Sequence, residues 1–324
     1  MKTEFDKFID LALKYEHFES SLKLSSALNL FHYTSPVGLL GILDHSDGIH
    51  LHFTRMDCLN DLSEGKLLSE HYDAVCKKLL KEDQITELHY NEIINLDLQD
   101  TRAFLFRINN TSNFKLVKYT SYLCCFSSDQ DSLPMWRYYS KNNRDQGYNI
   151  KFCSHVFEKF FSREALETRG HELELYKIKY STEENKELIS KIILDFKPYI
   201  LNPEFNSIAK TVIRNYLTRL KFQYKSHHFQ SENEIRAILY VPEEIPIEAT
   251  AYARYAVKYK NREGLIVPYI DVLLERKSWV VGATIGPLVD HTLAKQLLYT
   301  FLKDKGYNRC ELQDIQTSQV PIRY

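Results

Sequence analysis

Two glutamates and an arginine stand at alternate positions of one short stretch, as Glu232, Glu234 and Arg236. The apolar run over residues 235–241 predicts a strand that is entered from a polar loop. If the backbone is already extended at Glu232, all three ionisable side chains lie on one face of that strand. Burying unpaired charge is costly. This face therefore meets water, closes on itself as an ion pair, or holds a polar ligand.

Carboxylates at this spacing suit the cleavage of an N-glycosidic bond. One carboxylate stabilises the developing oxocarbenium ion, and a polar residue two positions earlier orients the incoming nucleophile. We therefore predict Glu234 and Glu232 as catalytic residues. A structural alternative stays open, in which Glu234 pairs with an arginine across the sheet and Glu232 caps a turn.

The triplet His32, Tyr33 and Thr34 ends a predicted strand, just before a helix that Ser35 caps and Pro36 begins. An imidazole and a hydroxyl there could grip a ribose, and the helix dipole would favour a pyrophosphate nearby. Taken alone, the triplet favours a simpler interpretation. In that interpretation, His32 bonds a neighbouring backbone carbonyl.

Ser127 ends a predicted strand, and Trp136 and Tyr139 follow on a predicted helix. A hydroxyl beside aromatic rings could form a stacking platform for a flat base. Ordinary packing of a helix on a sheet would use the same residues, and this feature alone favours packing.

Other chemistry-bearing residues give weaker signals. His50 and His52 share a strand face, but no Cys or carboxylate pattern completes a known ligand spacing, so we predict no metal site. One modest basic cluster favours a solvated helix end over a phosphate contact. It comprises Lys221, Lys225, His227 and His228. No Walker loop, GxGxxG, GxSxG or HExxH motif occurs.

Composition indicates a folded protein without a membrane span. Hydrophobic residues make up 44% and charged residues 26% of 324, near the averages for globular proteins. The net charge of −1 gives no global argument for binding nucleic acid or membranes. The chain lacks a signal-peptide pattern at its start, any run of 18 apolar residues and a CxxC motif, so we expect a reduced, cytoplasmic location.

The elements that must position these residues form one α+β domain over residues 28–324, preceded by an N-terminal helix within residues 1–27. Helical insertions are expected near residues 64–113 and 183–224, the second broken at Pro198 and Pro203. The alternating segment 173–180 predicts a strand with one face in water. Further strands are expected at residues 28–34, 49–54, 119–127, 147–153, 251–259, 264–270 and 279–285, and a helix at residues 290–305.

In this order, the segments resemble a bacterial protein family known only as a domain of unknown function. The resemblance spans about residues 28–324. Its marks are His32-Tyr33-Thr34, the loop Leu59-Asn60-Asp61-x-x-Glu64, Cys125-Phe126-Ser127, Trp136-x-x-Tyr139, Gly147-Tyr148-x-Ile150-x-Phe152, Glu232-x-Glu234-x-Arg236, Gly286-Pro287 and Ser318-x-x-Pro321.

More weakly, the start resembles ADP-ribosyltransferases of the His-Tyr-Glu type, which include DNA-modifying toxins that bacteria use against phage. The resemblance implies a split, mostly antiparallel sheet, NAD as substrate, and a nucleic acid or a protein as acceptor. His32 would bind the adenosine ribose and Glu234 would catalyse the transfer. The role of stacking on nicotinamide falls to one of Ser127, Trp136, Tyr138 or Tyr139. The expected cofactor-binding set is His32, Tyr33, Thr34, Ser127, Trp136, Tyr139 and Arg236.

Two other function classes remain open. One is a binding module without chemistry, a nucleotide or nucleic-acid sensor that uses the same cleft. The other is a metal-dependent nuclease in which Glu232, Glu234 and Asp61 converge on Mg²⁺.

Overall fold

A mixed α+β fold is seen in the computed structural model, which describes residues 2–16, 29–59, 66–96, 98, 102–107, 114–139, 147–153, 172–243, 256–262 and 264–321. Eleven strands in the described residues form one sheet, and all named strand pairs are antiparallel except β10 with β11. The predicted α+β class with a mostly antiparallel sheet is confirmed. The strands are β1 (Leu30–Thr34), β2 (Ile49–Arg55), β3 (Arg102–Arg107), β4 (Phe114–Ser127), β5 (Tyr148–Phe152), β6 (Glu172–Lys177), β7 (Glu234–Pro242), β8 (Val257–Arg262), β9 (Leu265–Leu274), β10 (Val280–Ile285) and β11 (Ile315–Thr317).

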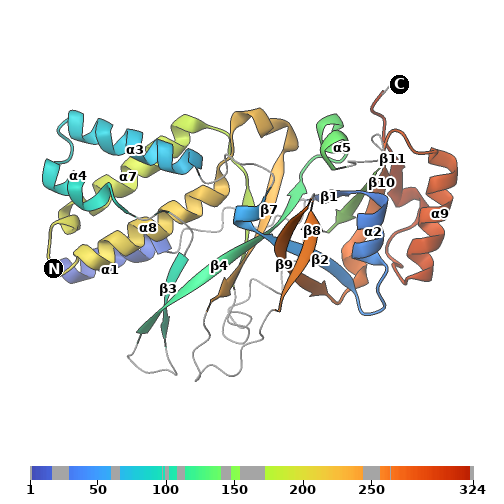
Figure 1. Cartoon of the computed structure of the whole chain (residues 1–324), viewed down its shortest axis with the longest axis horizontal. Helices are drawn as coiled ribbons and strands as arrows, with labels where there is room; N and C mark the ends of the chain where they lie inside the picture. Colours follow the sequence, from blue (N-terminus) through green and yellow to red (C-terminus); the bar gives the residue numbers. More distant parts are fainter. Residues whose placement is uncertain are drawn as a thin grey trace.

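Helices gather at both ends of the molecule (Figure 1). At one end lie α1, α3, α4, α7 and α8, and at the other α2 and α9, with the sheet between them. The α-helices are α1 (Glu4–Glu16), α2 (Pro36–Leu43), α3 (Lys66–Lys81), α4 (Glu87–Ile93), α5 (Leu133–Tyr139), α7 (Thr182–Ile200), α8 (Asn206–Gln223) and α9 (His291–Asp304). The short 3₁₀ helices are η1 (Met56–Cys58), η3 (His227–Glu232), η4 (Lys277–Trp279) and η5 (Leu312–Asp314).

The long strand β4 is the axis of the sheet, and the sheet splits along one of its edges. On one side β4 pairs with β7 along nine residues, and β7 pairs with β6. On the other side β1 meets β4 at a single pair, Phe31 with Ser127, and β2 meets it only at Thr54 and Arg55. From there β1 continues into β5, β10 and β11, whereas β2 continues into β9 and β8. The strands that carry the candidate residues, β1, β4 and β7, are therefore direct neighbours.

The two largest hydrophobic clusters among the described residues hold the fold together. One lies between the sheet and helices α2 and α9, and the other lies within the group of helices at the far end. The helix α1 belongs to the second core, because Phe8 packs against Phe196, Tyr199 and Phe205 with ring centroids 4.7–6.1 Å apart. The N-terminal helix thus docks on the second helical insertion.

Local chemistry explains how β1 leads into α2. The Ser35 side chain accepts a hydrogen bond from the Gly38 backbone N–H at 3.1 Å, and Pro36 occupies the first helical turn. A Cβ at Gly38 would collide with the hydroxyl of Thr34. Glycine at this position therefore lets the end of β1 lie directly against the helix.

Three expectations about elements need correction. The insertion expected near residues 64–113 contains the helices α3 and α4, but it also contains β3, which pairs with the first half of β4. The strand β6 is not half exposed along its length: α8 packs on it, and Leu173, Glu174, Leu175 and Tyr176 are all buried, whereas Lys177 at its end is exposed. The helix α7 continues through Pro198 to Ile200.

In the parts of the chain that are described, no helix is both long enough and apolar enough to cross a membrane.

Candidate functional site

The candidate residues meet where β1, β4 and β7 lie side by side. Phe31 of β1 pairs with Ser127 of β4, and Ser127 pairs with Glu234 of β7. Residues paired in this way point to the same face of a sheet. The start of β7 therefore lies on one side of the end of β4, and the residues of β1 around Phe31 and His32 lie on the other side.

The backbone around the glutamates differs from the expectation. Glu232 is not in the strand: it ends the 3₁₀ helix η3, and β7 begins only at Glu234. Between them Asn233 adopts a left-handed conformation, with φ 44° and ψ 47°, which Asn tolerates better than most residues. Despite this change of backbone direction at Asn233, both carboxylates lie beside one cation, Lys225.

The charged side chains form a buried ion cluster, which we define as Lys225, Glu232, Glu234 and Arg236. Arg236 Nε and Nη2 donate to the two oxygens of Glu234 at 2.8 and 3.1 Å. Lys225 Nζ donates to Glu232 at 2.7 Å and to Glu234 at 3.1 Å. None of the four residues is more than 9% exposed. Of the three possibilities for this face, the structure shows the one in which the charges close on each other.

The two glutamates differ in their acid–base behaviour. Burial favours the protonated form of Glu234, but Arg236 and Lys225 outweigh it and lower its pKa to about 2. Burial raises the pKa of Glu232, against the attraction of Lys225. Glu234 is therefore held as a carboxylate, while Glu232 binds a proton more readily than an exposed glutamate.

We expect acid to weaken the fold through Glu234. Its pKa falls from an ordinary value of 4.5 to about 2. Between these pH values Glu234 is protonated in the unfolded chain but remains a carboxylate in the native chain. The free energy of unfolding should drop by on the order of 3 kcal/mol between those pH values. Urea titrations at a series of pH values would measure this, and the drop should be smaller in Glu234→Gln. Parallel curves for the two proteins would contradict the prediction.

Lys225 was expected to lie at a solvated helix end, and that expectation is wrong. It lies two residues after the end of α8, its ammonium lies 4.6 Å from the ring centre of Phe229, and it is only 9% exposed. Sequence spacing gives no sign of this role, because the turn between α8 and η3 sets the distance to the glutamates. The other members of the ion cluster were all named from the sequence.

His32 adopts the simpler of its two predicted roles. Its Nδ1 lies 3.0 Å from the backbone oxygen of Cys125, and its ring packs against Phe126. Since alternate residues of a strand point to opposite faces, His32 faces away from the side that Phe31 shares with Glu234. Burial lowers the pKa of His32, so its ring is neutral at pH 7. The Cys125 thiol lies within hydrogen-bonding reach of Glu234, so one residue adjoins both the imidazole and the carboxylate.

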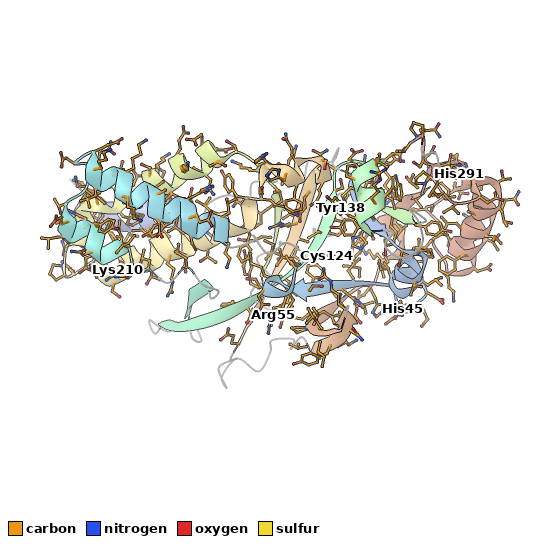
Figure 2. All side chains as sticks on the ribbon, turned by 45° about the horizontal axis from the view of Figure 1, so that its top comes forward. His45, Arg55, Cys124, Tyr138, Lys210 and His291 are labelled. Atoms are coloured by element: carbon orange, nitrogen blue, oxygen red, sulfur yellow. The ribbon has the colours of Figure 1, made fainter. Side chains whose placement is uncertain are left out.

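Four more of the predicted contacts with a cofactor are engaged within the protein: Tyr33, Ser127, Trp136 and Tyr139. Tyr33 donates from its hydroxyl to Asp129 O at 2.8 Å, and Trp136 donates from Nε1 to Asp131 at 2.8 Å. Their rings pack edge to face, 4.7 Å apart, and Tyr139 packs on the same cluster. Ser127 donates to Glu232 O at 2.7 Å and so fixes η3 to β4. Tyr138 is exposed on α5 (Figure 2). Packing of α5 on the sheet thus accounts for these aromatic residues.

A separate polar pocket of about 220 Å³ lies between α8, β4 and the end of β2. Ser121 is one of the residues that line this pocket, and its buried hydroxyl has no hydrogen-bond partner among the described residues. Ser121 precedes Ser127 by six residues along β4, which corresponds to about 20 Å. Charged residues of both signs also line the pocket: Arg55, Asp57, Lys221 and Glu243.

Comparison with known proteins gives a family match for part of the chain. Residues 135–237 match a family model described as "Protein of unknown function (DUF2971)". The match runs from α5 to β7 and includes the whole ion cluster, but not His32 or Ser127. No curated protein and no solved structure matches the chain. The loop around Asp61 and Glu64 lies outside the described residues.

Proposed function

We propose that the protein cleaves NAD and transfers ADP-ribose to a nucleic acid or a protein. One observation carries this proposal: Glu232 and Glu234 lie beside each other at the start of β7, next to Ser127 at the end of β4, where β1 also meets β4; the side chain of His32 on β1 faces the other side of the sheet. The spacing of these residues along the chain does not by itself require their strands to be neighbours. The split between β1 and β2 at the edge of β4 is a second supporting feature.

In the proposed reaction, the bond between nicotinamide and C1′ of the ribose breaks, and nicotinamide leaves with the bonding electrons. Glu234, held ionised by Arg236, stabilises the positive charge that develops on the ribose. A nucleophilic atom of the acceptor then forms a bond to C1′. Glu232, whose pKa is raised, takes the proton that the acceptor loses.

The ion cluster sets one condition on this mechanism. Arg236, Lys225 and the Cys125 thiol all contact the Glu234 carboxylate, and a carboxylate has about four acceptor positions. A ribose hydroxyl can therefore bind only if one donor withdraws. Lys225 is the donor that can do so, because its flexible side chain also has Glu232 as a partner.

Incubating the full chain with NAD, labelled in its adenylate phosphate, and a bacterial lysate tests the proposal. We expect free nicotinamide and label that becomes attached to a macromolecule. Digesting the products with nuclease or with protease distinguishes a nucleic-acid acceptor from a protein. The absence of both nicotinamide and transferred label, with any lysate, would overturn the proposal.

Binding without chemistry is the second candidate function. The observation that favours it is the pocket between α8, β4 and the end of β2, which Ser121 and charged residues of both signs line. A ligand with both donors and acceptors, such as a nucleotide, would complement the charges of both signs that line this pocket. Saturable binding of NAD or ADP-ribose without release of nicotinamide would identify this function. A Mg²⁺-dependent nuclease is less well supported, because Glu232 and Glu234 face cations and do not present free oxygens to a common point.

A further inference from the structure

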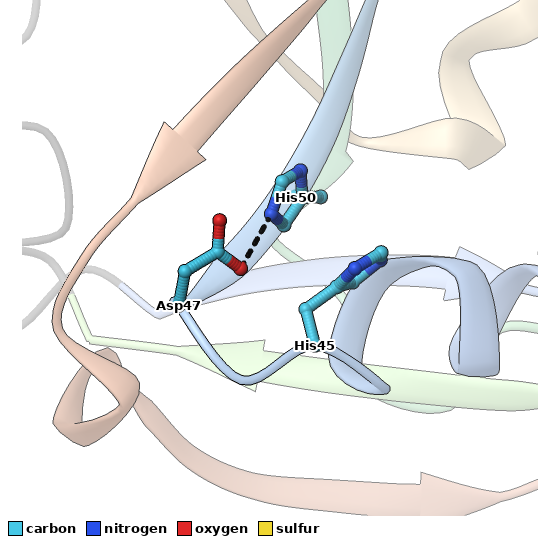
Figure 3. Close-up of side chains that lie close together, drawn as sticks. All are labelled: His45, Asp47 and His50. Atoms are coloured by element: carbon cyan, nitrogen blue, oxygen red, sulfur yellow. Dashed lines mark hydrogen bonds and ion pairs between the residues drawn. The ribbon is translucent and has the colours of Figure 1, made fainter.

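We propose that His45, Asp47 and His50 form a binding site for a divalent transition-metal ion such as Zn²⁺ (Figure 3). One ligand atom of each residue lies within 4.8 Å of the other two. Two imidazoles and a carboxylate are a donor set that proteins use for zinc and related ions with open coordination positions. This site is separate from the ion cluster and from the Ser121 pocket.

The chain brings these residues together through one tight turn. His45 follows the end of α2, Asp47 lies in the turn, and His50 is the second residue of β2. Gly48 has φ 154°, and a Cβ there would lie only 2.5 Å from the backbone oxygen of Leu274. The turn is thereby pressed against the end of β9, which fixes where β2 begins.

Distances within the turn suit a shared ion. The rings of His45 and His50 have their centroids 4.0 Å apart, and His50 Nε2 lies 3.0 Å from an oxygen of Asp47. Metal–ligand bonds of 2.0–2.2 Å place neighbouring ligand atoms roughly 3.0–3.5 Å apart, for angles from a right angle to the tetrahedral angle that zinc prefers. His45 Nε2 donates to Gly41 O at 2.9 Å, so Nδ1 retains the lone pair that binds metal.

A residue on another strand accepts a hydrogen bond from the second ring nitrogen of His50, as is usual for metal-binding histidines. Asp271 of β9 accepts from His50 Nδ1, with distances of 3.0 and 3.1 Å to its two oxygens. A carboxylate at this nitrogen orients the ring and directs the other nitrogen to the metal. Lys258 of β8 in turn holds Asp271 at 2.8 Å. The ligand His50 is thus positioned by a carboxylate that is itself fixed.

The sequence did not predict this site, because the residue that shares a strand face with His50 is His52. These two share a face of β2, but the ring of His52 packs on Tyr269 at 4.3 Å. The partners of His50 come instead from the turn before the strand. A plain alternative explains the same contacts without a metal: His50 could be an imidazolium ion between Asp47 and Asp271.

Calorimetric titration of the full chain with Zn²⁺ distinguishes these two explanations. We expect saturable binding of one ion at this site and a rise in melting temperature with Zn²⁺ concentration. His50→Gln and His45→Gln should each weaken binding by more than about 100-fold, and Asp271→Asn by about 10–100-fold. His52→Gln is the matched control, and it should bind Zn²⁺ as the unaltered chain does.

Two further measurements keep the test decisive. Circular dichroism and melting of each metal-free variant show whether it is folded, and Asp47→Asn serves as a third ligand variant if either histidine change unfolds the chain. The absorption spectrum of the Co²⁺-substituted protein should lack a thiolate charge-transfer band. No saturable binding, equal binding by the ligand variants, or a thiolate band would overturn the proposal in favour of the ion-pair explanation or a cysteine site.

Discussion

Arg236→Met should lower the free energy of unfolding by about 3–5 kcal/mol, because it breaks a buried ion pair by removing one partner. Arg236 is fully buried, and it holds both oxygens of Glu234 and also donates to Phe222 O at 3.3 Å. Without it, Glu234 shares the single cation Lys225 with Glu232. Urea unfolding followed by tryptophan fluorescence measures the loss, since Trp136 is buried in α5 beside the same region.

A double variant shows whether the pair itself is responsible. Glu234→Leu alone should cost a similar amount, since it leaves Arg236 buried without its carboxylate. Glu234→Leu combined with Arg236→Met removes both charges and leaves Lys225 with Glu232 as a complete pair. The double variant should therefore be more stable than the sum of the two losses predicts. Additive losses would mean that packing, and not the ion pair, gives these residues their effect.

The sequence was a good guide where local chemistry decides the structure. The Ser35 cap and Pro36 correctly predicted the start of α2, and the helix expected at residues 290–305 is α9, which Asp290 caps and which ends just before Gly306. The apolar run after Glu234 correctly predicted β7. In each case, the residues that fix the element lie within or directly beside it, so periodicity and capping preferences suffice.

The sequence was a poor guide where a distant segment decides the environment. The alternation in β6 indicates a half-exposed strand, yet α8 covers the polar face and pairs Arg219 with Glu174. Lys225 has the composition of a solvated helix end, yet the turn into η3 buries it against two glutamates. Pairing between β2 and β9 brings Asp271 to His50 across 221 positions of sequence. No pattern within a single segment reveals contacts of this kind.

Glu234→Gln should reduce NAD cleavage by at least about 10²-fold, because a neutral amide cannot stabilise a developing positive charge as a carboxylate does. The same change also disturbs the ion cluster, so loss of activity alone would not separate catalysis from folding. The structure offers a matched control in Glu174 of β6. Glu174 is buried to a similar degree, lies on the adjoining strand, and is bonded to Tyr176 and paired with Arg219.

Glu174→Gln should therefore lower stability while leaving NAD cleavage per folded molecule close to that of the unaltered chain. Both variants would be assayed at a temperature where unfolding curves show that each remains native. If the two glutamine variants lose activity equally, or if Glu234→Gln keeps full activity while melting earlier, Glu234 acts only as part of the scaffold. Binding without chemistry would then be the better account of the same fold, because the ion cluster would serve only to join η3 to the sheet.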